Sequence, residues 1–174
     1  MPKLLATLEL AAAYSSVAVF DPDLEKPYNN WTDRHIEQGF SWRDGSVSLS
    51  TVASTGVKVE VWLSEQQDLL SHTQRAIQVP FIIHKSGQVG ISDISGEDHI
   101  VEVPEGSYNL IFENGLRSDV ECSPRDDELG LRPMWCRLSF IISSSPHAEI
   151  LKEEGRVEIP LSPTYPLLME AEPA

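Results

Sequence analysis

Carboxylates are the residues of this chain whose types and spacing come closest to known chemistry. Asp21, Asp23 and Glu25 alternate along one short stretch, and oxygen donors spaced in this way begin many calcium-binding loops. Lys26 stands where an EF-hand loop has its glycine, and Thr32 stands where the loop has its bidentate glutamate. The sequence therefore excludes an EF-hand, and a looser calcium-binding loop at one end of a β-sandwich stays open as an alternative.

Catalytic and metal-binding motifs are otherwise missing from the sequence. The stretch 39–43 contains the first glycine and the serine of a nucleophile elbow but lacks its second glycine. The five histidines are scattered, with no H-x-H or H-E-x-x-H spacing, and no glycine loop of the phosphate-binding type occurs. We therefore expect a protein that is not an enzyme and that holds no cofactor and no metal.

Two groups of carboxylates stand close together in the sequence, and we expect both groups to lie in loops and short turns. The first group surrounds residues 31–45 and consists of Asp21, Asp23, Glu25, Asp33, Glu37 and Asp44. The second group consists of Asp119, Glu121, Asp126, Asp127 and Glu128. One interpretation is a solvated acidic rim. The other is a collective role, in which carboxylates imitate phosphates and occupy a basic cleft of a partner protein.

Net charge points toward the same kind of partner. The chain has 27 acidic and 13 basic residues, a formal charge of −14 and a calculated pI near 4.6. Such charge keeps many proteins dispersed in solution. Binding to nucleic acid depends on Lys and Arg that replace counterions, and no basic cluster is present. A basic protein partner is therefore favoured over direct contact with nucleic acid.

Residues 31–45 also encode the short element that must position the first group. Thr32 is suited to the N-cap of a helix, Asp33 to its first turn, and Gly39 to the left-handed residue that ends it. Trp31 and Ile36 are spaced to pack against each other across the cap. We predict a helix of at most two turns near residues 32–39.

Alternation of apolar and polar residues dominates the rest of the chain. The clearest example is 57–63, with valines and a leucine on one face and Lys58, Glu60 and Trp62 on the other. Residues 4–13 alternate enough to form a first strand. The other predicted strands are 14–20, 46–51, 75–84, 88–92, 99–103, 108–113, 135–143 and 156–159. So many short strands favour an all-β fold, a two-sheet antiparallel β-sandwich with one short helix.

Length and composition set the expected organisation. We predict a single β-sandwich domain over residues 1–160, followed by a proline-rich C-terminal tail over 161–174 that is extended or mobile. Glu9 interrupts the apolar start, so we expect no signal peptide, and no apolar run is long enough for a membrane span. Cys122 and Cys136 lack zinc-ligand spacing. We expect reduced thiols and a cytoplasmic location.

Several of these residues resemble a known protein family. The matching residues are Trp31-Thr32-Asp33, Ile36-Glu37, Gly39-Phe40 and Asp44 to Ser48, with weaker matches at Tyr14, Val19-Phe20, Val79 to Phe81 and Pro104 to Leu110. Together they resemble the competence protein J family, whose members inhibit a DNA-entry nuclease. The resemblance covers roughly residues 8 to 115. It implies a nuclease inhibitor, linked either to DNA uptake or to immunity against a toxin nuclease.

The partner surface that this resemblance implies combines charge with an aromatic anchor. Its expected residues are Asp21, Asp23, Asp33, Glu37, Trp42 and Asp44. Trp42 is the anchor because aromatic residues among charges are frequent hot spots of interfaces; its alternative role is to close one end of the core together with Trp31. The expected partner is a basic nuclease. A free strand edge would allow pairing with a second copy, but no sequence feature requires it, so the oligomeric state stays open.

Overall fold

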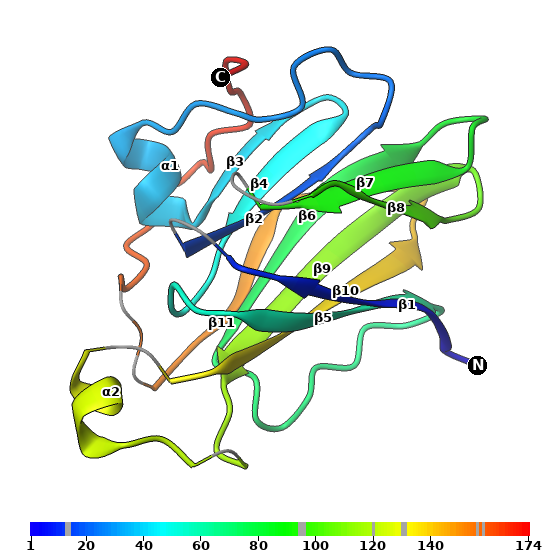
Figure 1. Cartoon of the computed structure of the whole chain (residues 1–174). Coiled ribbons are helices and arrows are strands. Elements are labelled where there is room, and N and C mark those ends of the chain that lie inside the picture. The colour runs from blue at the N-terminus through cyan, green and yellow to red at the C-terminus, as the bar shows by residue number, and fades with distance from the viewer. Residues whose placement is uncertain (13–14, 94–96, 120, 130–131, 156, 158) are drawn as a thin grey trace.

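A computed structural model describes residues 1–12, 15–93, 97–119, 121–129, 132–155, 157 and 159–174. It confirms the predicted sandwich, because two β-sheets pack face to face (Figure 1). The described residues form two short helices, of which one was predicted. Three strand predictions fall partly outside the described residues, because residues 13, 14, 156 and 158 are among those left out.

The elements follow one another in this order: β1 (Lys3–Leu10), β2 (Ser16–Phe20), α1 (Asp33–Gln38), β3 (Phe40–Arg43), β4 (Ser46–Ser50), β5 (Val57–Ser64), β6 (Arg75–Ile83), β7 (Gln88–Ser92), β8 (His99–Glu102), β9 (Gly106–Leu116), α2 (Pro124–Glu128), β10 (Met134–Ile142) and β11 (Glu149–Glu153). Sheet A has the strand order β1-β5-β10-β9-β6-β11, and sheet B has the order β3-β4-β2-β7-β8.

One pairing departs from the predicted antiparallel arrangement. Sheet B is antiparallel throughout, but in sheet A strand β10 lies antiparallel to β9 and parallel to β5. The cause is the connection between β5 and β6. Residues 65–74 do not form a hairpin but cross over β10 and β9, so β5 and β6 run in the same direction with two strands between them.

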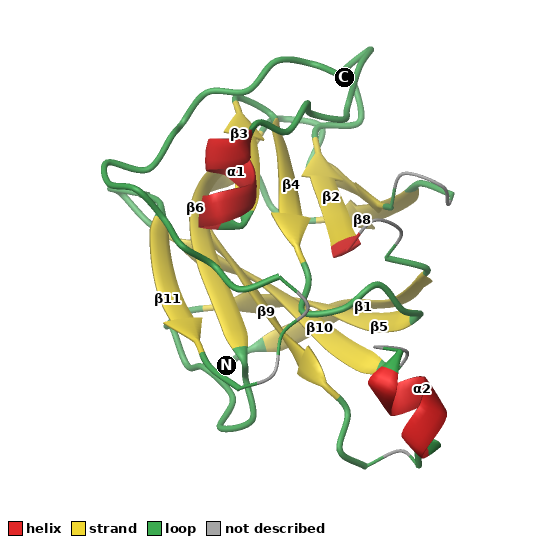
Figure 2. Cartoon of the chain, turned by 90° about the vertical axis from the view of Figure 1, so that its left-hand side faces the viewer, coloured by secondary structure: helices red, strands yellow, loops and turns green. Residues whose placement is uncertain are grey.

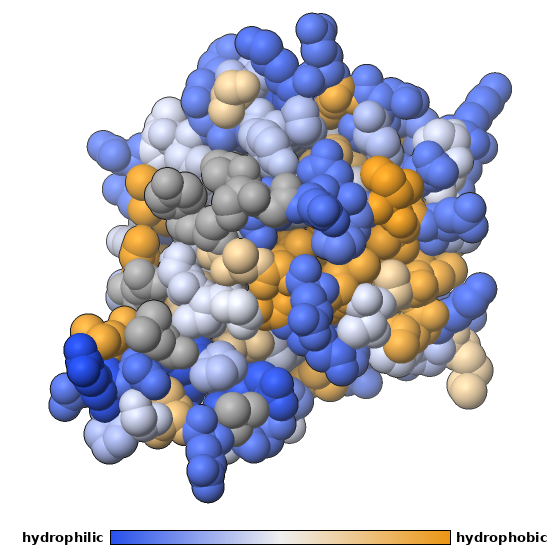
Figure 3. Space-filling model, in the orientation of Figure 1, coloured by the Kyte–Doolittle hydropathy of each residue, from blue (hydrophilic) through white to orange (hydrophobic). Residues whose placement is uncertain are grey.

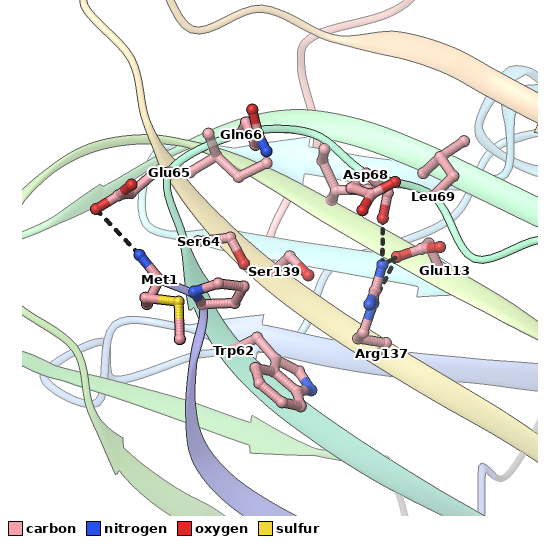
Figure 4. Close-up of a pocket in the computed structure, with 13 residues that line it drawn as sticks. Met1, Trp62, Ser64, Glu65, Gln66, Asp68, Leu69, Glu113, Arg137 and Ser139 are labelled. Carbon is pink, nitrogen blue, oxygen red and sulfur yellow. Dashed lines mark hydrogen bonds and ion pairs between the residues drawn. The ribbon is translucent and has the colours of Figure 1, made fainter.

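A buried ion pair fastens this crossover to the outer face of sheet A. Glu113 on β9 is 1% exposed and pairs with Arg137 on β10. The same carboxylate accepts hydrogen bonds from the backbone N–H of Leu70 (2.9 Å) and the hydroxyl of Thr73 (2.8 Å), while Arg137 also donates to the carbonyl of Asp68 (2.6 Å). Figure 4 shows Arg137 between Asp68 and Glu113.

The core lies between the sheets and follows the predicted alternation. In β5, Val57, Val59 and Val61 are buried while Lys58 is exposed. Aromatic rings from neighbouring strands of sheet A meet edge to face in this core, as in the pair Tyr108 and Phe140, whose ring centroids are 5.7 Å apart.

Both helices are short. α1 has six residues and α2 has five. α1 confirms the predicted helix, because it begins after Thr32 and ends at Gly39, whose φ of +83° is the left-handed conformation expected there. Among the described residues no helix is long and apolar enough to cross a membrane.

Two short strands differ from the prediction. β3 was not predicted, because its four residues follow the helix directly and carry no clear alternation. Of the predicted strand 156–159 only residues 157 and 159 are described, and neither lies in a strand. The last strand of the described chain is β11 at Glu149–Glu153, which was not predicted. Its residues are charged at three of five positions and half-exposed at the sheet edge, which hides the period-two pattern.

Candidate partner-binding surface

One face of α1, which we call the free face, is formed by Asp33, Ile36 and Glu37. Asp33, Ile36 and Glu37 are spaced i, i+3, i+4 and therefore lie together on this face. Asp33 is exposed, Glu37 is half-buried and Ile36 is 44% exposed. Among the described residues neither carboxylate has an ion-pair partner. The free face thus presents two unpaired carboxylates around an exposed apolar side chain.

The opposite face of α1 binds the end of the chain, residues 161–174, which we call the C-terminal strap. The side chain of Gln38 donates to the carbonyl of Leu168 (2.9 Å) and accepts the N–H of the same residue (2.8 Å). His35 Nε2 lies 2.7 Å from the carbonyl oxygen of Glu170. Both helix side chains are at most 2% exposed. The strap, for which we predicted an extended or mobile tail, lies against the helix (Figure 2).

An apolar groove of about 240 Å³ borders the free face. Trp31, Ile36 and Ile159 form its apolar part, and Ile159 is 50% exposed. The other lining residues are Ser15, Ser16, Ser50, Thr51 and Arg75. Trp31 and Ile36, expected to pack together, line this same groove. Ile159 escaped the sequence analysis because it comes from the far end of the chain, within a segment predicted as a strand.

Arg75 fixes one wall of this groove. Its side chain is 1% exposed and forms an ion pair with Glu153 on β11 (3.0 Å). It also donates to the hydroxyl of Ser50 (2.9 Å) and to the carbonyl of Ile159 (2.6 Å). Because Glu153 compensates the guanidinium charge, the wall carries no excess positive charge toward the carboxylates of the free face.

Three other predicted carboxylates gather at the turn between β3 and β4. The backbone N–H of Asp21 donates to the carbonyl of Gly45 (2.7 Å), which follows Asp44. Oδ1 of Asp21 accepts the N–H of Asp23 (2.9 Å). Asp23 and Asp44 are exposed. Among the described residues no three or more acidic, His or Cys side chains gather closely enough to hold a metal ion, so Asp21, Asp23 and Glu25 form no calcium cage here.

Trp42 is half-buried at the junction of the two sheets. Its indole N–H donates to the carbonyl of Pro80 on β6 (2.7 Å), and its ring packs against the core. The indole nitrogen therefore serves the structure, as the alternative interpretation of this residue expected. A contact between Trp42 and a partner stays a prediction for the exposed part of the ring.

The second acidic group lies elsewhere. Asp119 pairs with Arg117 at 2.7 Å, and the hydrogen bond from this guanidinium lowers the pKa of the Asp119 carboxyl. Asp126 and Glu128 are exposed on α2, which lies far from α1 in both views (Figures 1 and 2). The side chain of Asp127 is outside the described part of the structure.

None of the described lining residues of three other cavities belongs to α1, although carboxylates line these cavities too, among them Asp68, Glu102 and Asp119. The pocket at the crossover, about 370 Å³, has the paired Glu113 and Arg137 in its wall. A wider groove of about 660 Å³, which we call the edge groove, separates β1 from β8. Leu4 and Ile100, which are 45% and 51% exposed, line it on the face where Figure 3 shows apolar side chains.

Comparisons with known proteins agree with the fold and extend to the helix. The family model for competence protein J (ComJ) matches residues 9–141, well over half of the chain. The DNA-entry nuclease inhibitor of Bacillus subtilis (strain 168) is 28% identical over 102 residues, which cover 59% of this chain and 76% of that protein. Both sequence comparisons therefore extend beyond any single motif.

Two solved structures share the fold. The crystal structure of ComJ from Bacillus subtilis, described as an inhibitor of the DNA-degrading activity of NucA, superimposes with a TM-score of 0.64 at 21% identity, covering 81% of this chain and 99% of that one. The product of crocagin biosynthetic gene J gives a TM-score of 0.50 at 16% identity, with coverages of 82% and 99%. Taken with the sequence match over residues 9–141, these findings show that the chain belongs to the competence protein J family.

Proposed function

We propose that this protein binds a nuclease and inhibits its degradation of DNA, without catalysing a reaction itself. The observation that carries the proposal is the free face of α1, where unpaired Asp33 and Glu37 flank Ile36 beside an apolar groove. The family supplies the class of partner, because its relative in Bacillus subtilis is a DNA-entry nuclease inhibitor.

The charges account for how the two proteins meet. A nuclease binds DNA through a cleft lined by Lys and Arg, and this chain carries a net charge of −14. Opposite charges steer association and raise its rate by about 10 to 1,000-fold, an effect that salt weakens. Asp33 and Glu37 then stand where the DNA phosphates would lie, so the nuclease cannot hold its substrate.

The groove accounts for how the complex persists. Apolar side chains at the centre of an interface slow dissociation, because they bury area that water would otherwise cover. The groove between Trp31, Ile36 and Ile159 fits an apolar side chain of the nuclease. Because the neighbouring carboxylates are unpaired, that side chain belongs to a segment with Lys or Arg beside it. A competence role and a toxin-immunity role differ only in which nuclease provides this segment.

A DNA-degradation assay tests the proposal. The purified protein is titrated against the nucleases encoded beside its gene, at low and at high salt. We expect one nuclease to lose its activity at a stoichiometric ratio of inhibitor, with a dissociation constant that rises with salt. The proposal fails if every such nuclease stays fully active and forms no complex.

Removal of charge from α1 tests the surface. The double variant Asp33→Asn and Glu37→Gln keeps the shape of the free face, and we expect association with the nuclease to slow by about tenfold at low salt. The matched control, Asp126→Asn with Glu128→Gln, removes the same charge from α2 and is expected to change the rate by less than about twofold. Equal rates for the two double variants would contradict the assignment to α1.

A further inference from the structure

α1 is too short to keep its shape alone. It contains six residues, whereas isolated helices of fewer than about 12 residues are marginal in water. A surface that depends on Asp33, Ile36 and Glu37 keeping fixed relative positions therefore needs support from elsewhere in the chain. β3 follows the helix directly and supports one end of it.

The C-terminal strap supports the helix along its length. The N–H of Ser162 donates to the carbonyl of Glu37 (2.8 Å), and Arg34 donates to the carbonyl of Pro166 (2.6 Å). Beyond the helix, the N–H of Asn30 donates to the carbonyl of Glu172 (2.8 Å). The strap is thus bound near the C-terminal end of α1, beside its first turn, and to the segment that precedes it.

Gln38 is the centre of these contacts. Its amide group makes both hydrogen bonds to Leu168 and a third, at 3.0 Å, to the carbonyl of Phe40. The side chain is 1% exposed, and a buried amide of this kind is unfavourable unless its hydrogen bonds are made. Gln38 therefore joins α1, the start of β3 and the strap into one rigid unit.

The strap also lies outside the part of the chain that matches the family, which ends at residue 141. We propose that the strap is a positioning element of the partner-binding surface and that Gln38 is the positioning residue through which it acts. The inference rests on the proposed function. By holding the opposite face of α1, the strap keeps the free face ordered before the nuclease arrives, so binding does not have to order it.

Full-length variants at Leu168 test this inference. Leu168→Pro removes the N–H that donates to Gln38, whereas the matched control Leu168→Ala shortens the side chain and keeps both backbone groups. Gln38→Met removes the same contacts from the helix side at similar volume. Amide hydrogen exchange of residues 36–39 is measured in the free proteins, and the dissociation constant of the nuclease complex is measured well below each thermal midpoint.

We expect exchange at residues 36–39 to be about tenfold faster, and the dissociation constant about tenfold higher, in Leu168→Pro and in Gln38→Met, in keeping with the loss of buried hydrogen bonds. Leu168→Ala should stay within about twofold in both measurements. Adding Leu168→Pro to Gln38→Met should change little, because the one hydrogen bond that Leu168→Pro removes is already lost in Gln38→Met.

Unchanged exchange at residues 36–39 overturns the inference whether or not a nuclease binds. Faster exchange with an unchanged dissociation constant also overturns it, because the helix would then be held by the strap without serving the partner. If the wild-type protein inhibits no nuclease, the proposed function fails, and with it the positioning of a partner-binding surface; exchange then reports only whether the strap orders α1.

Discussion

The two open sides of the sandwich are treated in opposite ways. On the side of β3 and β6, the chain covers the gap with α1 and the C-terminal strap, which His35 and Gln38 join by hydrogen bonds from buried side chains. Buried Arg75 binds the carbonyl of Ile159, just before the strap. On the side of β1 and β8, the edge groove leaves core residues such as Leu5 and Leu63 in partial contact with water.

The difference favours the side of α1 as the partner-binding side. A free edge can be made harmless by simple devices, and β1 has two of them: Lys3 at its exposed end and a register shift between Leu4 and Ala6. Buried polar contacts are far more demanding, since each one must be satisfied. Their concentration around α1 indicates that a defined surface is maintained there.

Removal of Arg75 should have the largest effect. Arg75→Met leaves the half-buried Glu153 without its ion-pair partner and removes the bond to the Ile159 carbonyl. We expect the free energy of unfolding to fall by about 3 kcal/mol, measured by urea denaturation. On the other side, Lys3→Met changes an exposed residue and should stay within about 0.5 kcal/mol. A similar decrease in the free energy of unfolding in both variants would contradict the difference between the two sides.

Two exposed isoleucines, one on each side, test which side of the sandwich binds the nuclease. Ile36 and Ile100 are 44% and 51% exposed, and each lines the groove of its own side. Ile36→Ser should weaken nuclease binding by about 1–2 kcal/mol, while Ile100→Ser should leave the dissociation constant within about twofold. Calorimetric titration decides between them. A larger loss of binding in Ile100→Ser than in Ile36→Ser would show that the partner binds at the edge groove.

The smallest expected effect concerns stability at high pH. Burial raises the pKa of both Tyr28 and Tyr108 above the ordinary value near 10. The unfolded chain therefore loses these protons first, and the free energy of unfolding decreases as the pH rises above about 10. The Tyr28 hydroxyl shares a hydrogen bond with the hydroxyl of Ser92 (2.9 Å), and the Tyr108 hydroxyl donates to the carbonyl of Pro104 (2.8 Å).

Single Tyr28→Phe and Tyr108→Phe variants apportion this effect between the two tyrosines. Each should flatten the decrease between pH 9.5 and 11, because a phenylalanine has no proton to lose. Denaturation in urea at a series of pH values measures the slopes. An unchanged slope in both variants would show that other groups govern alkaline stability.

Local sequence patterns predicted the strands and the helix that depend on residues close together in the sequence. The alternation in 57–63 predicted β5, and the cap at Thr32 with the glycine at 39 predicted α1 within one residue at either end. The face that carries Asp33 and Glu37 follows from helical spacing once the helix is assigned. These features depend on residues within a few positions of one another, so the sequence exposes them directly.

Contacts between distant segments were not predictable in this way. The groove needs Ile159 beside Ile36, and the strap needs Leu168 beside Gln38, which are 130 positions apart in the sequence. The prolines of the tail suggested only an extended segment. Its apolar residues Leu161, Leu167 and Met169 pack against the core, and their presence in a proline-rich tail was the signal that it docks.

The parallel pair had no local signal either. The sequences of β5 and β10 each predict an ordinary half-buried strand, but neither predicts which strand it will pair with. The choice arises because residues 65–74 cross the sheet and are held there by Glu113 and Arg137. A pairing of this kind depends on where distant strands are placed, and the alternation within a strand does not record it.

That pairing also sets the order in which the sheet can be completed. β10 is the strand between β5 and β9, so the unit of β1 with β5 and the unit of β9 with β6 have no shared edge until residues 134–142 are available. On the ribosome, the first half of sheet A must therefore wait through the synthesis of some 70 further residues, with the edge of β5 unpaired. Sheets closed by such late, non-local pairings fold slowly, and this chain is most exposed to misassembly just before β10 emerges.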